Sequence, residues 1–152
     1  MQGFLNLIRS VFLSPELLVA AIMTFVWWVY PPPFAWTDKA IEKLEWLPLL
    51  GAFGALIVFA AGMCWKILFP AKNAVALCQW PRYPQLRTTT VVGLVFVVTG
   101  ALAGVAGVLG RGTMYEGLPS LLLTGGYAIS GIATLTMLMA ALTVRSITAY
   151  GN

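Results

Sequence analysis

The sequence predicts an all-α integral membrane protein with four transmembrane helices, and three observations lead to this prediction. The chain of 152 residues is 60% hydrophobic and 9% charged, with a mean hydropathy of +0.88. Soluble domains are about 45–50% apolar and about 25% charged, so a soluble fold could not cover this much apolar surface. Four stretches approach the roughly 20 apolar residues that a membrane-crossing helix needs. The length allows one domain, residues 1–152.

The first predicted span covers about residues 15–30 and begins at a helix-start pattern. Ser14 can cap the helix, Pro15 suits its first position, and Glu16 lies at the positive end of the helix dipole. Residues 2–13 carry apolar side chains at helical spacing, which predicts a separate amphipathic helix lying at the membrane interface. The span itself is short, roughly 24 Å at 1.5 Å per residue, so neighbouring helices or local thinning of the bilayer must absorb the mismatch.

The other three spans are predicted at about residues 46–69, 89–109 and 118–143. The connection between the first and second spans begins with YPPPFAW, whose prolines cannot continue a helix. The following TDKAIEKLEW predicts a short amphipathic helix on the outer surface, with Thr37 as its N-cap.

The basic residues predict the orientation of these spans, because Lys and Arg concentrate on the cytoplasmic side of membranes. Placing the N-terminus inside puts most of the nine basic residues inside, namely Arg9, Lys66, Lys72, Arg82, Arg87 and Arg145. The remaining basic residues then lie outside, beside Asp38, Glu42, Glu45 and Glu116. We therefore expect a bacterial inner-membrane protein with both termini in the cytoplasm.

The residue types argue against catalysis and against a bound cofactor. The chain has no histidine and two cysteines, Cys64 and Cys78, which cannot supply the three or four ligands of a zinc site. It has no Ser-His pair, no HExxH motif and no P-loop. No acidic or basic residue is expected near the middle of a span, where proton relays and ion-coupled transporters place such groups. We expect a protein that is not an enzyme and that holds no metal or cofactor.

Small residues recur at helical spacing in the third and fourth spans. Spacing of this kind lets two helix backbones approach closely, which is how helices associate in lipid. The pattern predicts either packing between helices of one chain or the seam of a homo-oligomer, and the sequence leaves both open. The residues concerned are Gly100, Gly104, Gly107, Gly126 and Ser130.

The connection between the second and third spans, residues 71–88, combines basic and aromatic side chains in the stretch CQWPRYPQLR. Arg and aromatic residues are typical anchors of protein interfaces, and basic segments also bind anionic lipid. We expect this loop to contact the bilayer or a cytoplasmic partner rather than nucleic acid, because its charge is explained by membrane topology. The predicted contact residues are Lys72, Trp80, Arg82, Tyr83 and Arg87.

Three functions fit these features. The first is a membrane subunit without catalytic activity, self-associating, that scaffolds or senses at the membrane and docks a cytoplasmic partner through residues 71–88. The second is an oligomeric channel or pore, with Thr and Ser of the fourth span as candidate lining residues. The third is an immunity, exclusion or phage-defence membrane protein, which needs no catalytic residue.

Overall fold

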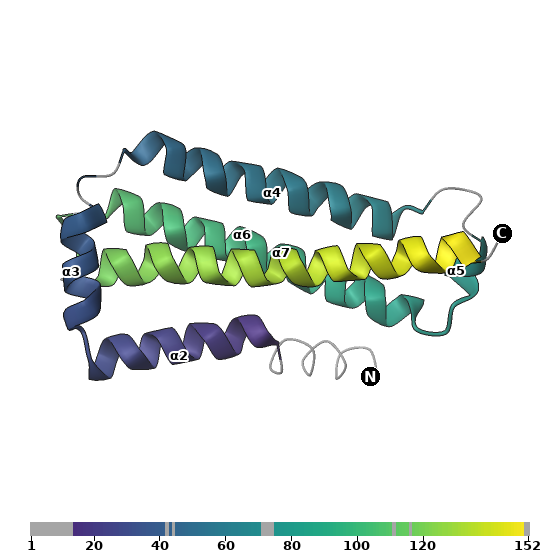
Figure 1. The fold of residues 1–152 in the computed structure, drawn as a ribbon, viewed down its shortest axis with the longest axis horizontal. Coiled ribbons are helices and arrows are strands. Elements are labelled where there is room, and N and C mark those ends of the chain that lie inside the picture. The colour runs from purple at the N-terminus through teal and green to yellow at the C-terminus, as the bar shows by residue number, and fades with distance from the viewer. Residues whose placement is uncertain are drawn as a thin grey trace.

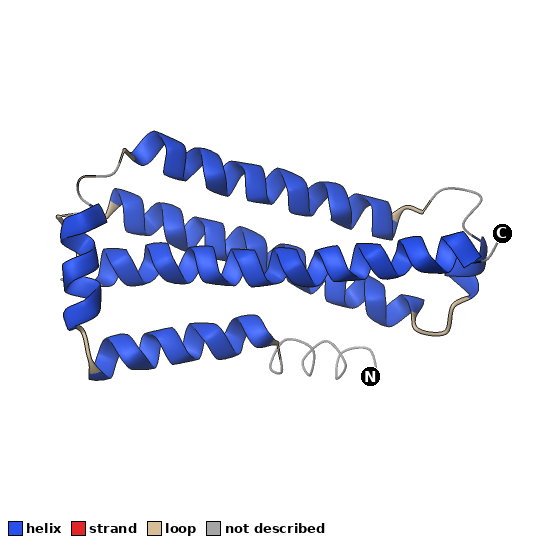
Figure 2. Cartoon of the chain, in the orientation of Figure 1, coloured by secondary structure: helices blue, strands red, loops and turns tan. Residues whose placement is uncertain are grey.

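The computed structural model describes residues 14–41, 43, 45–70, 75–110, 112–115 and 117–150. Within these ranges the regular elements are all helices (Figure 2). They are α2 (Pro15–Val29), α3 (Pro32–Ile41), α4 (Trp46–Leu68), α5 (Val75–Gln79), α6 (Tyr83–Leu109) and α7 (Leu118–Tyr150). The amphipathic helix predicted for residues 2–13 lies outside the described residues.

Three of the described helices are long and apolar enough to cross a membrane: α4, α6 and α7. Their apolar segments have 22, 27 and 31 residues, or roughly 33, 40 and 46 Å at 1.5 Å per residue, against a hydrocarbon core of about 30 Å. These helices indicate a membrane protein. The 15-residue α2 is apolar but reaches only about 22 Å, which is shorter than the hydrocarbon core.

Helices α6 and α7 lie side by side at the centre of the molecule (Figure 1). Helix α4 contacts both of them on one side, and α2 packs on α7 on the other side. Helix α3 runs across one end of the bundle, which we call the α3 end, and α5 lies at the opposite end, which we call the loop end. Helix α2 extends from the α3 end only about halfway along the bundle.

The start of α2 confirms the helix-start pattern in the sequence. Ser14 is the N-cap, its side chain accepts a hydrogen bond from the Leu17 backbone N–H at 3.3 Å, and Pro15 opens the helix. The predicted cap of the next helix, Thr37, is wrong. That helix begins at Pro32, because proline suits the first turn, and the Thr37 hydroxyl instead donates to the Pro33 carbonyl within the helix at 2.7 Å.

Helices α6 and α7 are longer than the predicted spans. Helix α6 begins at Tyr83 rather than near residue 89, since Pro84 lies in the first turn, where its missing N–H leaves no bond unmade. Helix α7 continues to Tyr150 rather than ending near residue 143. As a consequence, Arg87 and Arg145 are carried on helices at the loop end instead of on free loops.

The buried core lies between α4, α6 and α7, and α2 is outside it. One cluster of buried side chains, towards the α3 end, comprises Phe53, Ala101, Val108 and Leu123. A second cluster, towards the loop end, comprises Ala60, Cys64, Val97, Ala133 and Met137. The Phe53 ring also stacks on the Tyr127 ring with centroids 4.2 Å apart, which ties α4 to α7.

Candidate functional site

The segment at the loop end is held in place rather than free. Helix α5 contacts both α6 and α7, and its Leu77 side chain is fully buried. Two backbone hydrogen bonds continue the chain through tight turns, from Trp80 N–H to the Leu77 carbonyl and from Tyr83 N–H to the Trp80 carbonyl. The segment therefore presents its outward side chains in a fixed arrangement. Lys72, predicted as part of this site, lies outside the described residues.

Tyr83 fastens the start of α6 to the end of α4. Its side chain is buried, and its hydroxyl donates to the Ile67 carbonyl at 2.9 Å. The Arg87 guanidinium lies 5.8 Å from the centroid of the Tyr83 ring, within the range of a cation–π contact. The sequence predicted Tyr83 as a lipid or partner contact, whereas the structure places it inside the fold.

Three of the predicted contact residues lie at the surface of the loop end. Arg82 and Arg87 are exposed and Trp80 is half-buried. We call these three residues the loop-end surface. Cys78 on α5 is exposed nearby, whereas Cys64 on α4 is buried.

The predicted small-residue positions come together between helices of one chain. A Cβ added at Gly100 would lie 2.6 Å from the Ser130 hydroxyl oxygen, and one at Gly107 would lie 2.6 Å from the Pro119 carbonyl oxygen. A Cβ at Gly126 would collide with the Gly100 carbonyl. We call this contact the α6–α7 seam, made by Gly100, Gly104, Gly107, Gly126 and Ser130. Its small side chains let the two backbones touch.

Hydroxyl groups of the spans bond mainly to their own helices. Thr99, Thr124 and Thr134 each donate to the carbonyl four residues earlier, at 2.9, 2.6 and 2.7 Å. Ser130 differs, because its hydroxyl donates across the seam to the Val97 carbonyl at 3.1 Å. Hydroxyls bonded to their own helix in this way are typical of packed membrane helices.

Glu16 is the site that the sequence did not locate. Its side chain is 3% exposed, and its Oε1 lies 3.4 Å from the Thr136 hydroxyl oxygen on α7. Thr136 lies near the middle of the apolar segment Leu118–Thr148. Glu16 lies in the first turn of α2, as the sequence predicts. Because α2 begins halfway along the bundle (Figure 1), its carboxyl group lies beside the middle of α7.

Two opposing effects act on the Glu16 carboxyl group. It lies in the first turn of α2, where the helix dipole favours a negative charge by up to about 2 kcal/mol in a partly buried site. Burying an ionised carboxylate costs several kcal/mol unless a cation and further hydrogen bonds compensate it. Among the described residues of α7 the one cation is Arg145, which is exposed and nine residues beyond Thr136, roughly 14 Å along the helix.

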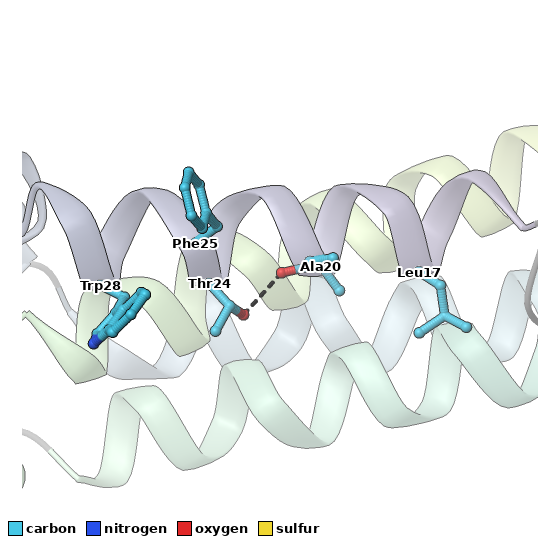
Figure 3. A pocket seen from close by; sticks show the side chains of 6 residues that line it. Leu17, Ala20, Thr24, Phe25 and Trp28 are labelled. Carbon is cyan, nitrogen blue, oxygen red and sulfur yellow. Dashed lines mark hydrogen bonds between the residues drawn. The ribbon is translucent and has the colours of Figure 1, made fainter.

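A shallow groove runs along one face of α2 (Figure 3). Figure 3 shows its lining, which is apolar apart from Thr24. The Thr24 hydroxyl donates to the Ala20 carbonyl at 2.8 Å, so it is satisfied within the helix. The lining residues are Leu17, Ala20, Ala21, Thr24, Phe25 and Trp28. An open apolar groove of this kind suits a lipid chain or another hydrophobic molecule.

Potential metal ligands do not gather in the part of the chain that the structure describes: no group of three or more Cys, Asp or Glu side chains could hold a metal ion there. Comparisons of the chain with protein-family models, with characterised proteins and with solved structures found no match. The proposals below therefore rest on the residues of this chain.

Proposed function

We propose that the protein is a membrane subunit without catalytic activity that binds an acidic segment of a cytoplasmic partner at its loop end. The observation that carries this proposal is the loop-end surface, where Trp80, Arg82 and Arg87 stand together on a fixed segment. Tryptophan and arginine are the residue types that contribute most to binding at protein interfaces.

The fixed geometry of the segment supports binding. A partner that meets an ordered surface loses less conformational entropy than one that must first order a loop. Burial of Leu77 and the hydrogen bond from Tyr83 to the Ile67 carbonyl provide that order.

The charge at the loop end favours an acidic partner. Lys66, Arg82, Arg87 and Arg145 are all exposed at this end. The acidic residues other than Glu16 lie in the sequence at positions 38–45 and 116, next to the helices of the α3 end. Complementary charge raises association rates and selects partners, so the basic end is the better candidate for docking.

Part of the proposal is a four-crossing topology in a bacterial inner membrane, with residues 15–30 in the first crossing and both termini in the cytoplasm. The excess of basic residues at the loop end supports this orientation. In intact cells, a membrane-impermeant maleimide should leave exposed Cys78 unlabelled and should label it in inverted vesicles. A Tyr115→Cys variant in a Cys78→Ala background, exposed at the α3 end, should show the opposite behaviour. Labelling of Cys78 in intact cells would show that the loop end lies outside and would contradict the proposed orientation.

Self-association is proposed through the outer face of α4 rather than through the α6–α7 seam. Gly51, Ala55 and Gly62 are exposed on α4, and a Cβ added at either glycine would meet nothing within 4 Å. Small residues on a lipid-facing helix allow close approach of a second chain. Gly62→Ile should reduce the oligomeric mass in detergent without unfolding the monomer. A similarly sized change on α6, Val95→Phe, should leave the mass unchanged.

The docking proposal is tested by photo-crosslinking of the full-length protein in cells. We expect Trp80→p-benzoylphenylalanine to form an adduct with one protein species. Adding Arg82→Ala should lower the adduct yield about thirtyfold, because truncating a central interface side chain costs about 2 kcal/mol and each 1.4 kcal/mol is a factor of about ten. The matched control is the same cross-linker at Trp36, an exposed tryptophan at the α3 end, which should not capture that species.

Two further results decide the proposal. Adducts from position 80 that contain lipid alone would show that the surface is a membrane anchor and would overturn docking. A Tyr83→Phe variant removes the hydroxyl that bonds to Ile67 and keeps the loop-end surface chemically intact. We expect it to weaken capture several-fold by loosening the segment, whereas Tyr115→Phe, at an exposed tyrosine, should have no effect.

A further inference from the structure

We propose that the protein binds an anionic phospholipid at the loop end, in a hollow between the end of α4 and the start of α6. The phosphate group of the lipid lies on the Arg87 guanidinium, and an acyl chain runs along α6 into the bilayer. The site shares Arg87 with the loop-end surface, but it does not depend on docking of a protein there.

The hollow is lined by side chains of both helices. One wall comes from the last turn of α4 and the other from the first turns of α6. Its volume is about 360 Å³, within the roughly 300–1,000 Å³ of ligand pockets. The hydrogen bond from the Tyr83 hydroxyl to the Ile67 carbonyl fixes the two walls relative to each other. The lining residues are Leu68, Pro84, Arg87, Thr88 and Val91.

Arg87 is the charged residue among those that line the hollow, and its N–H groups are available to a ligand. In the part of the chain that the structure describes, its guanidinium makes no ion pair or hydrogen bond, and it lies 5.8 Å from the centroid of the Tyr83 ring. The Thr88 hydroxyl donates to the Pro84 carbonyl at 3.1 Å, so its one hydrogen is already engaged. A phosphate group accepts two parallel N–H bonds from one guanidinium. The polar side of the hollow therefore suits an anion.

The aromatic residues beside Leu68 place the hollow at the surface of the bilayer. Trp65 and Phe69 are both exposed, and their ring centroids lie 4.4 Å apart. They share a face of α4 with Leu68, because residues three and four apart are neighbours on a helix. Exposed tryptophan at the end of an apolar span is typical of the level of the lipid headgroups. Basic pockets between spanning helices at this level bind the headgroups of anionic lipids.

The apolar residues that follow Arg87 on α6 favour a lipid over an acidic peptide. Val91 and Val95 are exposed and share the face of Arg87, because they follow it at four-residue spacing. They extend for roughly 12 Å along the span, and an acyl chain can follow this track. A peptide cannot enter it, because its backbone groups would find no hydrogen-bond partner in the hydrocarbon region.

The proposal is tested by native mass spectrometry of the full-length protein in detergent with added phosphatidylglycerol or phosphatidylcholine. We expect phosphatidylglycerol to bind more tightly than phosphatidylcholine, whose headgroup has no net charge. Arg87→Gln should lower the affinity for phosphatidylglycerol about tenfold, because a hydrogen bond to a charged group contributes about that factor. Equal affinities of the natural chain for the two lipids would overturn the proposal.

Two matched variants separate the site from a general attraction of charge. Arg145 is exposed on α7 at the same end and lies outside the hollow, so Arg145→Gln should leave the affinity for phosphatidylglycerol unchanged. Arg82→Gln should also leave it unchanged, although Arg82 belongs to the loop-end surface, so a failure of docking and a failure of lipid binding can be told apart. Equal losses of affinity from all three variants would overturn the site.

A soluble competitor separates the lipid from a free anion. Glycerol 3-phosphate carries a phosphate group without acyl chains, and we expect it to leave phosphatidylglycerol bound at millimolar concentration. Displacement of the lipid would show that the hollow is a site for a soluble phosphate compound, and it would overturn the proposal.

A second measurement identifies the occupant in a bilayer. In nanodiscs that contain both lipids, Val95→p-benzoylphenylalanine should form adducts enriched in phosphatidylglycerol, and Arg87→Gln should abolish the enrichment. The same cross-linker at Leu102, which is exposed further along α6, should form adducts in proportion to the lipids supplied. Adducts at position 95 without enrichment, or adducts with a protein in place of lipid in cells, would overturn the proposal.

Discussion

Helix α7 makes two contacts of different kinds on its two sides. Towards α6 it presents Gly126 and Ser130, and the two backbones touch. Towards α2 it presents Thr136, whose hydroxyl meets a buried carboxyl group. The first contact leaves no room for even one added methyl group. The second runs along half of the bundle and depends on side chains. One helix can therefore carry a rigid contact and a separable one.

The largest effect is expected from an added methyl group in the α6–α7 seam. A Cβ at Gly126 would meet the Gly100 carbonyl and the Gly104 nitrogen, which are backbone atoms that cannot move without parting the helices. We expect Gly126→Ala to lower the free energy of unfolding by about 2–3 kcal/mol, the upper part of the range for overpacking. Circular dichroism during unfolding in sodium dodecyl sulfate measures this change.

Gly125 provides the matched control for that variant. A Cβ at Gly125 would meet nothing within 4 Å, and alanine favours a helix over glycine by up to about 1 kcal/mol. Gly125→Ala should therefore be neutral or slightly stabilising. Equal losses of unfolding free energy from Gly125→Ala and Gly126→Ala would contradict the view that the close approach of α6 and α7 at Gly126 sets the cost.

The α6–α7 seam also shows how much of the helix packing can be predicted from the sequence. Spacing of small residues in two apolar spans predicted close helix packing, and both the spans and the residues could be identified without a structure. The choice between packing within one chain and packing between chains could not be made. It depends on which face of α6 turns towards α7, and the apolar residues around α6 are too evenly distributed to indicate a face.

The second-largest loss of unfolding free energy is expected from truncating a core methionine, and a methionine on α2 provides the comparison. Met137 is 1% exposed in the core cluster towards the loop end, whereas Met23 on α2 is half-buried. Truncating a buried side chain loses its packing contacts and leaves a cavity, which costs about 2–5 kcal/mol in a protein core. We expect Met137→Ala to cost about 2 kcal/mol, and Met23→Ala less than half as much. Equal costs would contradict the view that α2 is the separable element.

Glu16 and Tyr83 show what the sequence could not supply. The pattern Ser14-Pro15-Glu16 correctly predicted where α2 begins along the chain. It could not predict the depth at which α2 begins in the bundle, because that depth is set by packing on α7. Tyr83 stands among basic and polar residues in the sequence, which favours exposure. Its side chain is buried where its hydroxyl donates a hydrogen bond to the Ile67 carbonyl at the end of α4. These two residues are 16 positions apart in the sequence.

The smallest effect tests whether the polar bond across the seam adds to its close packing. The Ser130 hydroxyl donates to the Val97 carbonyl on α6 at 3.1 Å, whereas the Thr134 hydroxyl donates within α7 at 2.7 Å. Hydrogen bonds between membrane helices contribute about 0.6 kcal/mol on average. We therefore expect Ser130→Ala to lower the free energy of unfolding by about that amount, and Thr134→Val to leave it unchanged. Since the Gly126→Ala effect is expected to be several times larger, the contact of the backbones, and not the hydrogen bond, would then hold α6 to α7. A Ser130→Ala cost as large as that of Gly126→Ala would reverse this order and make the seam a polar contact like the one at Glu16.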